Sequence, residues 1–553
     1  MFVKERYLTV LISFIIVCGC FLFVISEALS VEYQLYDSPF PSENYDGPAT
    51  NCSPYDGLIE PNLAQAIEKD LYPAAFCFVS RKPDELYVIG GMGVIPTYIA
   101  KVNPLTLDRI KETPLNLGTA GYWPPSVVVH ANGYIYVTAQ NICYKLTPDI
   151  NIVSYYILPI IDGKYNSMKA FSDGNLICKG LGSTYSSVTL LDQNLNSIIH
   201  EFVLPEKSYG RLSVHIHNNK EYVYITGDTT LIRYEYIGEA PWLKKDNGWS
   251  YKYRLASSRL QTGGGVALFI DNNAYFADNA NSNPKPLGPI HLLRVNLDDS
   301  RDAQRFTPFG LPKGYHFNKH LVDPVHGIIV IGDTTNGKIG GYRYLGNNQF
   351  QELWVKNYVS GIVCSSSSST KQLYVNDFKD GRDNIVILDI ETGEELKRIV
   401  TSSTVMSLAG VTLGWNDDVF WVSGYCSVRM YNDLQQTQEF HAPKPALSSQ
   451  GNSAPRKVSM LYPNFPNPFN PDTWIAYSLS TNAFVSFDIY NLQGIRIRHI
   501  ELGYKSAGSY ISKDGAAHWD GRNEFGEEVP GGIYFYSIQA GEFKATRRMI
   551  VLK

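Results

Sequence analysis

Short apolar segments alternate with polar turns along most of the chain between residues 70 and 435. The recurring unit is an apolar strand, a tight turn containing Asn, Asp or Gly, and a second strand that ends in a small residue, as in PSVVVHANGYIYVTAQ and RLSVHIHNNKEYVYITGD. In most copies a third strand with a polar end follows, for example IVILDIETGEELKRI. Alternation of this kind predicts half-buried β-strands joined by tight turns.

The unit recurs eight times. The second strands are predicted to begin near Leu86, Tyr134, Leu176, Tyr222, Ala274, Ile328, Leu373 and Val419, a period of roughly 41 to 55 residues. A repeat of this length with three or four strands is typical of a β-propeller, in which each blade buries its faces against its neighbours. We therefore expect a propeller of about eight blades over residues 31–440, or of seven blades if one unit is an insertion.

The region before the first complete unit has two predicted features. Residues 31–72 are expected to supply a strand that closes the ring with the last blade. Within them, NLAQAIEKDLY (Asn62 to Tyr72) has the spacing of a short helix. Because helical spacing is scarce elsewhere, the predicted fold class is all-β.

The end of the chain differs from the repeats. Residues 441–458 are rich in Pro, Ser, Ala and Gly and have no periodicity, which predicts a linker. The run YPNFPNPFNP then carries four prolines in ten residues and predicts stiff, extended backbone. Beyond it, TWIAYSLS, FVSFDIYN and GIYFYSIQA alternate apolar and polar residues, which predicts an Ig-like β-sandwich over residues 459–553.

Ordered motifs in this tail resemble the C-terminal Ig-like domain shared by the flagellar hook-capping protein and the type IX (Por) secretion sorting domains. The matching residues are Pro466, Asn467, Pro468, Phe469, Asn470 and Pro471; Ile489, Tyr490, Asn491 and Gly494; Trp519, Asp520, Gly521, Arg522 and Gly526; Gly531, Gly532, Tyr534 and Tyr536; and Gly541, Phe543, Thr546, Arg547, Met549 and Lys553. The resemblance implies a tail that the secretion machinery reads and that directs surface attachment or secretion. Trp519 is expected to be a core anchor.

The first 30 residues have the features of an export signal. Lys4 and Arg6 precede an apolar run that reaches about Ile25, and the small residues Ala28 and Ser30 fit a cleavage site. Because the apolar run is long, an uncleaved membrane anchor is the alternative. The formal net charge of −5 gives no indication of a nucleic-acid partner.

Six cysteines follow the signal segment: Cys52, Cys77, Cys143, Cys178, Cys364 and Cys426. Export would permit disulfides. The spacings are wide and irregular, however, and several of these cysteines lie in apolar strand patterns. Most are therefore expected to be buried free thiols, with Cys52 and Cys77 as the one candidate pair.

Candidate histidine sites occur in two places. His215 and His217 lie two apart on a predicted strand and would face the same side, as paired metal ligands do. His316, His320 and His326 cluster in GYHFNKHLVDPVHG, and His320 is the one expected near the channel. Neither group has a further ligand at a telling spacing, so ordinary structural roles are the expectation for both.

Three aspartates surround a glycine in NDFKDGRDN: Asp377, Asp380 and Asp383. Oxygen-rich turns of this kind bind calcium, although the spacing is not that of an EF-hand loop. No phosphate loop, GxSxG elbow or HExxH motif is present. The sequence therefore assigns no catalytic, cofactor-binding or metal-ligating residue, and calcium is the one cofactor considered.

Two functions are compatible with these features. The first is an exported bacterial propeller, at the cell surface or secreted, that binds an extracellular protein or glycan and contacts membrane only through its N-terminal segment. The alternative function is an exported enzyme of the quinoprotein-like dehydrogenase, lyase or sulfotransferase type with its site on the channel face. The alternative location is the periplasm. The repeat IVILDIETGEELKRI resembles quinoprotein and YVTN-like propellers, which supports the fold alone. Converging charged side chains in the channel would favour an enzyme, and a channel of Ser, Val and Gly would favour a binding module.

Overall fold

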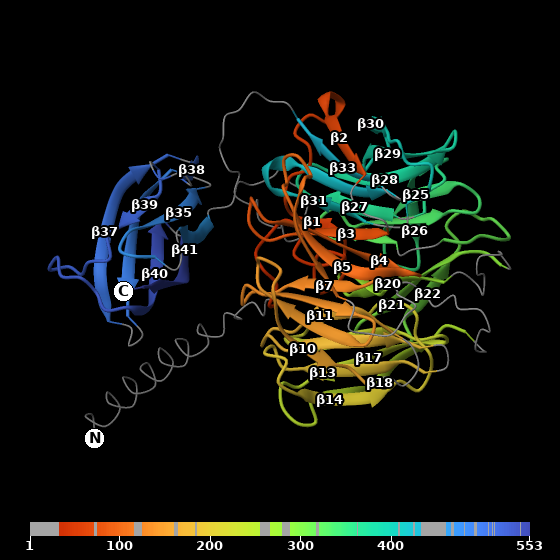
Figure 1. Ribbon diagram of the computed structural model, residues 1–553, viewed down its shortest axis with the longest axis horizontal. Helices are drawn as coiled ribbons and strands as arrows, with labels where there is room; N and C mark the ends of the chain where they lie inside the picture. The colour runs from red at the N-terminus through yellow and green to blue at the C-terminus, as the bar shows by residue number, and fades with distance from the viewer. Residues whose placement is uncertain are drawn as a thin grey trace, which may run out of the picture. The chain divides into compact units, whose positions relative to one another are not determined.

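A computed structural model of the chain (Figure 1) consists of β-strands with two short 3-10 helices, Pro61–Leu63 and Trp415–Asp417, in its described part. The structure describes residues 33–70, 74–115, 124–159, 164–182, 185–254, 266–278, 288–316, 320–361, 363–407, 410–423, 426–432, 460–465, 469–479, 482–491, 495–506, 508–510, 513, 515–541 and 543–552. The predicted signal, residues 1–30, and the predicted linker, residues 441–458, lie outside these ranges. Within them no helix has the length and apolar character needed to cross a bilayer.

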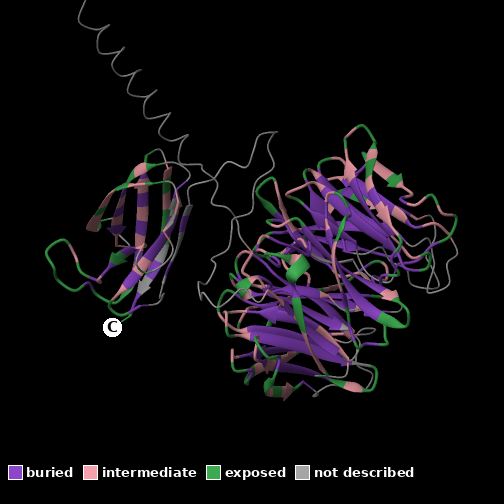
Figure 2. Ribbon diagram, turned by 90° about the horizontal axis from the view of Figure 1, so that it is seen from above, coloured by how far each residue is buried: buried purple, intermediate pink, exposed green. Residues whose placement is uncertain are grey.

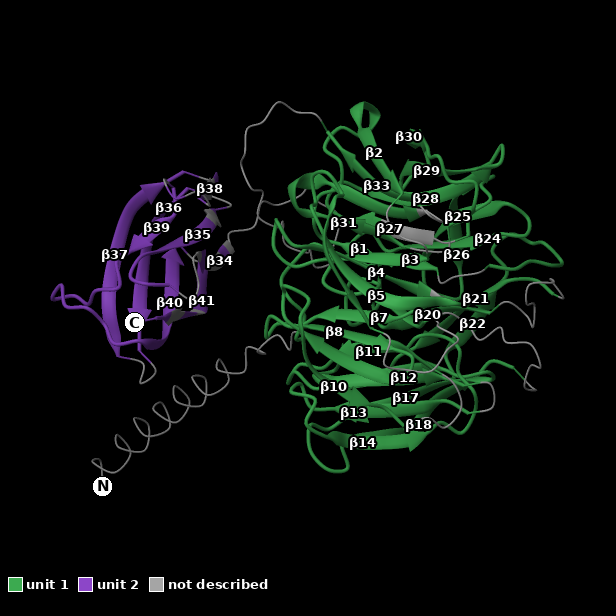
Figure 3. Ribbon diagram, in the orientation of Figure 1, with its two compact units in different colours: residues 1–449 green, residues 450–553 purple. Residues whose placement is uncertain are grey.

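The chain divides into two compact units, residues 1–449 and residues 450–553 (Figure 3). In the described part of the first unit, eight sheets, each with four antiparallel strands, are the blades of a β-propeller, so the seven-blade alternative is wrong. Blades 1 to 4 contain β3 (Ala75–Ser80), β4 (Leu86–Met92), β5 (Ile95–Val102) and β6 (Arg109–Pro114); β7 (Ser126–Val129), β8 (Ile135–Ala139), β9 (Ile142–Leu146) and β10 (Ile152–Ile157); β11 (Lys164–Ala170), β12 (Leu176–Leu181), β13 (Ser187–Leu191) and β14 (Ile198–Val203); and β15 (Ser213–His217), β16 (Lys220–Thr226), β17 (Thr230–Tyr236) and β18 (Leu243–Lys252).

The remaining four blades follow the same order along the chain. They contain β19 (Leu268–Ile270), β20 (Asn273–Asp278), β21 (His291–Asn296) and β22 (Ala303–Phe306); β23 (Leu321–Asp323), β24 (Ile328–Asp333), β25 (Lys338–Tyr344) and β26 (Phe350–Lys356); β27 (Val363–Ser367), β28 (Gln372–Lys379), β29 (Arg382–Asp389) and β30 (Glu395–Val400); and β31 (Val411–Leu413), β32 (Val419–Ser423), β33 (Cys426–Tyr431) and β2 (Gln65–Asp70). Every second strand begins at its predicted position or within two residues of it.

The ring is closed by a strand from the start of the chain. β2 pairs antiparallel with β33, from Gln65 opposite Tyr431 to Asp70 opposite Cys426, and is the outer strand of blade 8. The expected closing strand is therefore confirmed. The helix expected from Asn62 to Tyr72 is wrong, because pairing with the open edge of blade 8 overrides a weak helical propensity.

The hydrophobic core is distributed around the ring. Eight clusters of buried residues each join the faces of two neighbouring blades, including the one in which Phe78 and Val88 of blade 1 meet Phe420 and Val422 of blade 8. Figure 2 shows most of the blade strands buried, while exposed residues lie in loops and on the outer strands. Each blade thus covers the apolar faces of its neighbours, which is what a repeated, doubly apolar sheet requires.

The described cysteines carry free thiols. Cys52, Cys77, Cys143, Cys178 and Cys426 are all buried and unpaired. The Cys52–Cys77 disulfide is therefore wrong. Cys77 packs in the cluster between blades 1 and 2, whereas Cys52 lies on β1 (Cys52–Ser53) beside Ser366 of blade 7.

The C-terminal unit is built from two four-stranded sheets. One contains β34 (Met460–Phe465), β35 (Thr473–Leu479), β38 (Gly508–Tyr510) and β39 (Ala517–Trp519), and the other contains β37 (Arg496–Lys505), β36 (Ala483–Tyr490), β40 (Gly532–Ala540) and β41 (Phe543–Val551). A single cluster of buried residues contains side chains from both sheets. Trp519 is 1% exposed within it, as expected for a core anchor.

The proline run meets the end of the chain in this unit. Phe469 is buried against Trp519, and its carbonyl accepts a hydrogen bond from the Leu552 N–H at 2.8 Å. Phe469 also forms a parallel bridge with Val551. Pro466, Asn467 and Pro468 lie outside the described residues, as do the motif residues Gly494 and Lys553. The described part of the proline run therefore fixes the last strand of the unit.

Candidate functional site at the propeller axis

The inner end of the blades encloses residues 33–58, here called the axial segment. First strands of successive blades contact one another, so they surround the axis of the ring. Most residues from Ser38 to Leu58 are buried. Backbone contacts join the axial segment to the first strands of four blades: Ser80 N–H to the Phe40 carbonyl in blade 1, Ser42 opposite Val128 in blade 2, Val214 N–H to the Gly47 carbonyl in blade 4, and Cys52 opposite Ser366 in blade 7. The chain thus occupies its own axis.

Serine side chains line the wall that faces the axial segment. Ser80 donates its N–H to the Phe40 carbonyl at 3.0 Å and accepts the Phe40 N–H on Oγ at 3.3 Å. In blade 7, Ser367 Oγ donates to the Tyr55 carbonyl at 2.6 Å. Because an irregular buried segment has no ladder of its own, these hydroxyls satisfy its backbone groups. The hydroxyls of Ser80 and Ser367 are therefore engaged with the axial segment.

Charged side chains lie on one flank of the axial segment. Arg211, in the loop before β15, pairs with Glu43 of the axial segment at 2.5 Å, and its guanidinium lies over the ring of Phe76 in blade 1. Lys169 of β11 donates to the backbone carbonyls of Glu43 and Asp46. These contacts connect blades 1, 3 and 4 to the axial segment. The charged groups of Arg211 and Lys169 therefore already have partners within the chain.

A further lysine is fully buried beside this flank. Lys179, at 0% exposure near the end of β12, donates to the carbonyls of Ser208 at 2.8 Å and Gly180 at 3.2 Å, and no carboxylate of the described residues pairs with it. Burial, together with the nearby Arg211, lowers the pKa of Lys179 to about 7. Burial also lowers the pKa of Lys169 to about 8, against the attraction of Asp46 and Glu43.

Buried aspartates lie at the ends of the second strands of four consecutive blades, or within two residues of those ends: Asp228, Asp278, Asp333 and Asp377. Asp333 accepts hydrogen bonds from the backbone N–H of Tyr315 at 3.2 Å and from the side chain of Asn336 at 2.6 Å. Asp377 accepts the Val359 N–H at 3.0 Å. Each of these two carboxylates ties the loop that enters its blade to the second strand of that blade. The repeated aspartate therefore organises loops at this end of the propeller.

The paired histidines of blade 4 have separate structural roles. The ring of His215 stacks on Phe269 of blade 5, with ring centres 4.1 Å apart, and burial lowers the pKa of His215 to about 3. His217 instead contacts Asp298 at 2.8 Å. One histidine therefore packs between blades and the other contacts an exposed aspartate, and the structure does not bring them together as ligands.

The three histidines of blade 6 are also dispersed. His316 hydrogen-bonds Thr334 at 3.1 Å, and His320, at 0% exposure, hydrogen-bonds the Tyr275 carbonyl of blade 5 at 3.1 Å. His326 contacts the carboxylate of Asp323 at 2.8 Å. His320 thus bridges neighbouring blades and does not face the channel.

The three aspartates of blade 7 do not form a calcium site. Asp377 pairs with Arg398 at 2.8 Å, and Asp383 accepts hydrogen bonds from Asn376 and from the Ser407 N–H. Asp380 lies in the turn between β28 and β29. Within the ranges that the structure describes, no group of three His, Cys, Asp or Glu residues could hold a metal ion. The calcium hypothesis is therefore wrong for this turn.

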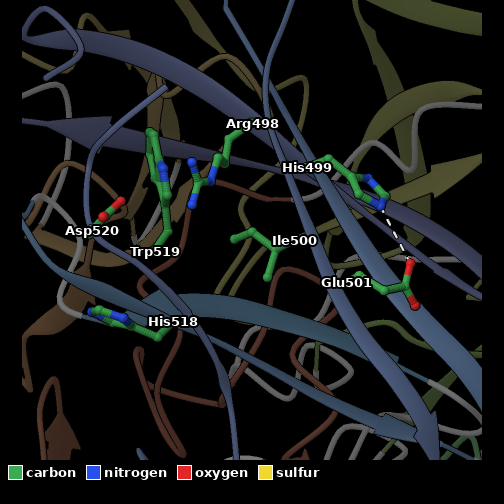
Figure 4. A pocket seen from close by; sticks show the side chains of 7 residues that line it. All are labelled: Arg498, His499, Ile500, Glu501, His518, Trp519 and Asp520. Carbon is green, nitrogen blue, oxygen red and sulfur yellow. Dashed lines mark ion pairs between the residues drawn. The ribbon is translucent and has the colours of Figure 1, made fainter. Parts of the chain in front are cut away.

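A shallow pocket lies in the C-terminal unit (Figure 4). Its volume is about 280 Å³, and its lining residues are Arg498, His499, Ile500, Glu501, His518, Trp519 and Asp520. His499 contacts Asp488 at 2.8 Å and Glu501 at 3.4 Å, and its hydrogen bond to the Asp488 carboxylate raises the pKa of His499. His518 pairs with Asp472 at 2.7 Å. The ionisable side chains of this pocket are thus engaged with neighbouring carboxylates or backbone groups, as in the hydrogen bond from Arg498 to the Asn523 carbonyl.

Comparisons with known proteins agree on the propeller alone. The sequence matches no protein-family model and no curated protein. Among solved structures, it is similar to quinohemoprotein alcohol dehydrogenase from Comamonas testosteroni, at 11% identity and a TM-score of 0.50 over 76% of this chain and 83% of that one. BamB from Moraxella catarrhalis is similar at 12% identity and a TM-score of 0.42 over 66% and 98%. The chain shares the β-propeller fold with the Comamonas testosteroni protein, and an identity this low shows the fold alone.

Several residues of the axis were not found from the sequence. The axial segment has no periodicity, and Lys169, Lys179 and Arg211 lie in strands or loops of ordinary composition. The repeated strand-ending aspartate was visible in the copies ITGD, YFAD, VIGD and YVND. Alignment of the repeats would have identified that aspartate, but only the fold places the axial segment against the blades.

Proposed function

We propose that this chain is an exported bacterial protein, at the cell surface or secreted, whose propeller is a binding module for an extracellular protein or glycan. The C-terminal unit is proposed to direct secretion or surface attachment by contacting the secretion machinery. The proposal includes no nucleic-acid partner and no catalytic residue.

The occupied axis supports a binding role over the alternative of a propeller enzyme. An enzyme with its site on the channel face needs polar groups that a substrate can reach. Here Ser80 and Ser367 satisfy the backbone of the axial segment, and Arg211 pairs with Glu43 of that segment. Because these groups are already engaged, ligand contact is proposed for the loops and outer surfaces of the blades.

The motif residues of the C-terminal unit support the second part of the proposal. The resemblance to sorting domains rests partly on Phe469, Trp519 and Arg547, which in this chain hold the unit together. Phe469 and Trp519 are in its core, and Arg547 Nε donates to the Leu461 carbonyl at 2.7 Å. A stable unit that fixes its final strand is suited to present a C-terminal end to export machinery.

A paired binding and turnover experiment tests the propeller part. The purified full chain is incubated with an array of immobilised extracellular glycans and envelope proteins, and separately with primary alcohols, pyrroloquinoline quinone, calcium and a redox dye. We expect saturable binding to an array component that Lys179→Met leaves unchanged. Dye reduction that Lys179→Met abolishes, without such binding, would show that the axis is an enzyme site and would contradict the proposal.

A further inference from the structure

The outer strands of the eight blades differ in charge. Each outer strand has one side without a partner strand among the described residues, and such edges are usually protected by charged side chains. Seven of them contain a charged residue: β2, β6, β14, β18, β22, β26 and β30. β10 (Ile152–Ile157), with the sequence IVSYYI, contains none. The outer edge of blade 2 is therefore the unprotected one.

β10 is also the outer strand with the most exposed apolar surface. Ile152, Val153, Tyr155 and Ile157 are 40%, 52%, 49% and 62% exposed. Each other outer strand has at most one large apolar residue exposed to this degree, such as Ile110 of β6 at 58%. A contiguous exposed apolar row on an edge indicates an interaction surface, whereas a single exposed residue does not.

The backbone of β10 is available on its outer side. The Leu158 N–H donates to the Asn141 carbonyl at 2.7 Å, and the ladder continues inward with Tyr156 opposite Cys143. Since hydrogen-bonded pairs alternate in an antiparallel ladder, Tyr155 and Ile157 turn their N–H and C=O groups away from β9. These outward groups lie on the residues that also present the exposed side chains.

We propose that β10 joins two copies of this chain, each adding its strand antiparallel to the other about a two-fold axis at Tyr155. In this register Tyr155 faces Tyr155 of the second copy, and Val153 faces Ile157 of the second copy. An outer strand with charges, such as β6 with Arg109 and Lys111, would place like charges close together in the same arrangement. β10 instead places apolar side chains against one another and removes them from water.

Pairing through β10 would give a dimer with two binding propellers. The inference goes beyond the proposed function, because it does not depend on which ligand the propeller binds. If the ligand is a repeating glycan or a surface-bound protein, two linked sites would raise the avidity without any new ligand contact.

The test measures the mass of the full chain by size-exclusion chromatography with light scattering over a concentration series. Ile157→Lys places a charge at the proposed interface, and Ile110→Lys is the matched control on charged strand β6 with nearly the same exposure. We expect a dimer for the wild type and for Ile110→Lys, and a dissociation constant raised by roughly tenfold or more for Ile157→Lys. Circular dichroism verifies the fold of each variant.

A second variant keeps the test decisive if Ile157→Lys does not fold. Tyr155→Pro removes an N–H that points away from β9, so it blocks strand addition while the inner ladder remains. A wild-type chain that is monomeric at its highest soluble concentration would overturn the proposal. A dimer that Ile157→Lys, or in its place Tyr155→Pro, leaves intact would overturn it as well, as would equal weakening by Ile110→Lys.

Discussion

Lys179→Met is the most informative perturbation of the propeller axis. Lys179 is fully buried, its ammonium donates to two backbone carbonyls of the described residues, and its pKa is lowered from 10.5 to about 7, chiefly by burial. Methionine fills a similar volume and does not titrate. The substitution therefore removes the cost of a buried charge, together with the two hydrogen bonds to the carbonyls.

The magnitude and sign follow from proton linkage. A pKa difference of about 3.5 corresponds to about 5 kcal/mol. Below about pH 7 the lysine is charged in both the folded and the unfolded state, so the folded state bears the full cost. Between about pH 7 and pH 10.5 the unfolded state holds more protons than the folded state. Stability therefore rises with pH in this window, by up to about 1.4 kcal/mol per pH unit.

The assay is urea unfolding of the full chain at several pH values, with wild type, Lys179→Met and the exposed control Lys82→Met. Lys169 titrates in all three proteins and cancels in the comparison. From about pH 7 to about pH 9.5, the stability of wild type relative to Lys179→Met should rise by about 3 kcal/mol. The Lys82→Met protein should follow wild type. Parallel pH profiles for wild type and Lys179→Met would show that Lys179 is not buried as a cation and would refute the reasoning.

Two further substitutions test local features of the blades by thermal and urea unfolding. Asp333→Ala leaves the loop that enters blade 6 without its buried hydrogen-bond acceptor and should destabilise the propeller by about 3 kcal/mol. The exposed control Asp84→Ala should stay within about 0.5 kcal/mol of wild type. Equal effects of the two substitutions would contradict the role of Asp333 in holding this loop. Gly91→Ala, at φ 122°, places a Cβ 2.5 Å from the Thr97 Cα and should cost about 3 kcal/mol. Gly93→Ala, at φ 65° in open space, should cost about 1–2 kcal/mol. A smaller loss of stability for Gly91→Ala than for Gly93→Ala would contradict the close approach of Gly91 to Thr97.

The blade strands were predictable because each blade repeats the same alternation of apolar and polar residues. The second strand of blade 3 begins at Leu176 and that of blade 8 at Val419, as the apolar pattern predicts. Period-two alternation is a local property that burial between two neighbours imposes on every copy. The number of blades followed from counting those copies.

Features that depend on contacts distant in sequence were not predictable in the same way. Residues 65–70 have helical spacing, and only the free edge of β33 makes them a strand. The axial segment is irregular, and its partners Ser80, Ser367 and Arg211 come from separate blades. His320 has the composition of a site residue, but its carbonyl partner on blade 5 gives it a structural role. Contacts between residues distant in sequence determined each of these outcomes. Such contacts cannot be inferred from the local sequence pattern.

Localisation of the propeller is the most direct test of the central claim, that this chain is an exported propeller delivered to the outside by its C-terminal unit. The full chain and a chain ending at Ser449, the boundary between the two compact units, are expressed in the same Gram-negative host that carries type IX secretion machinery. Protease accessibility on intact cells, with fractionation of periplasm and medium, reports where each propeller resides. The account predicts that the full chain reaches the surface or the medium while the shortened chain stays folded in the periplasm. The same location for both chains would contradict it.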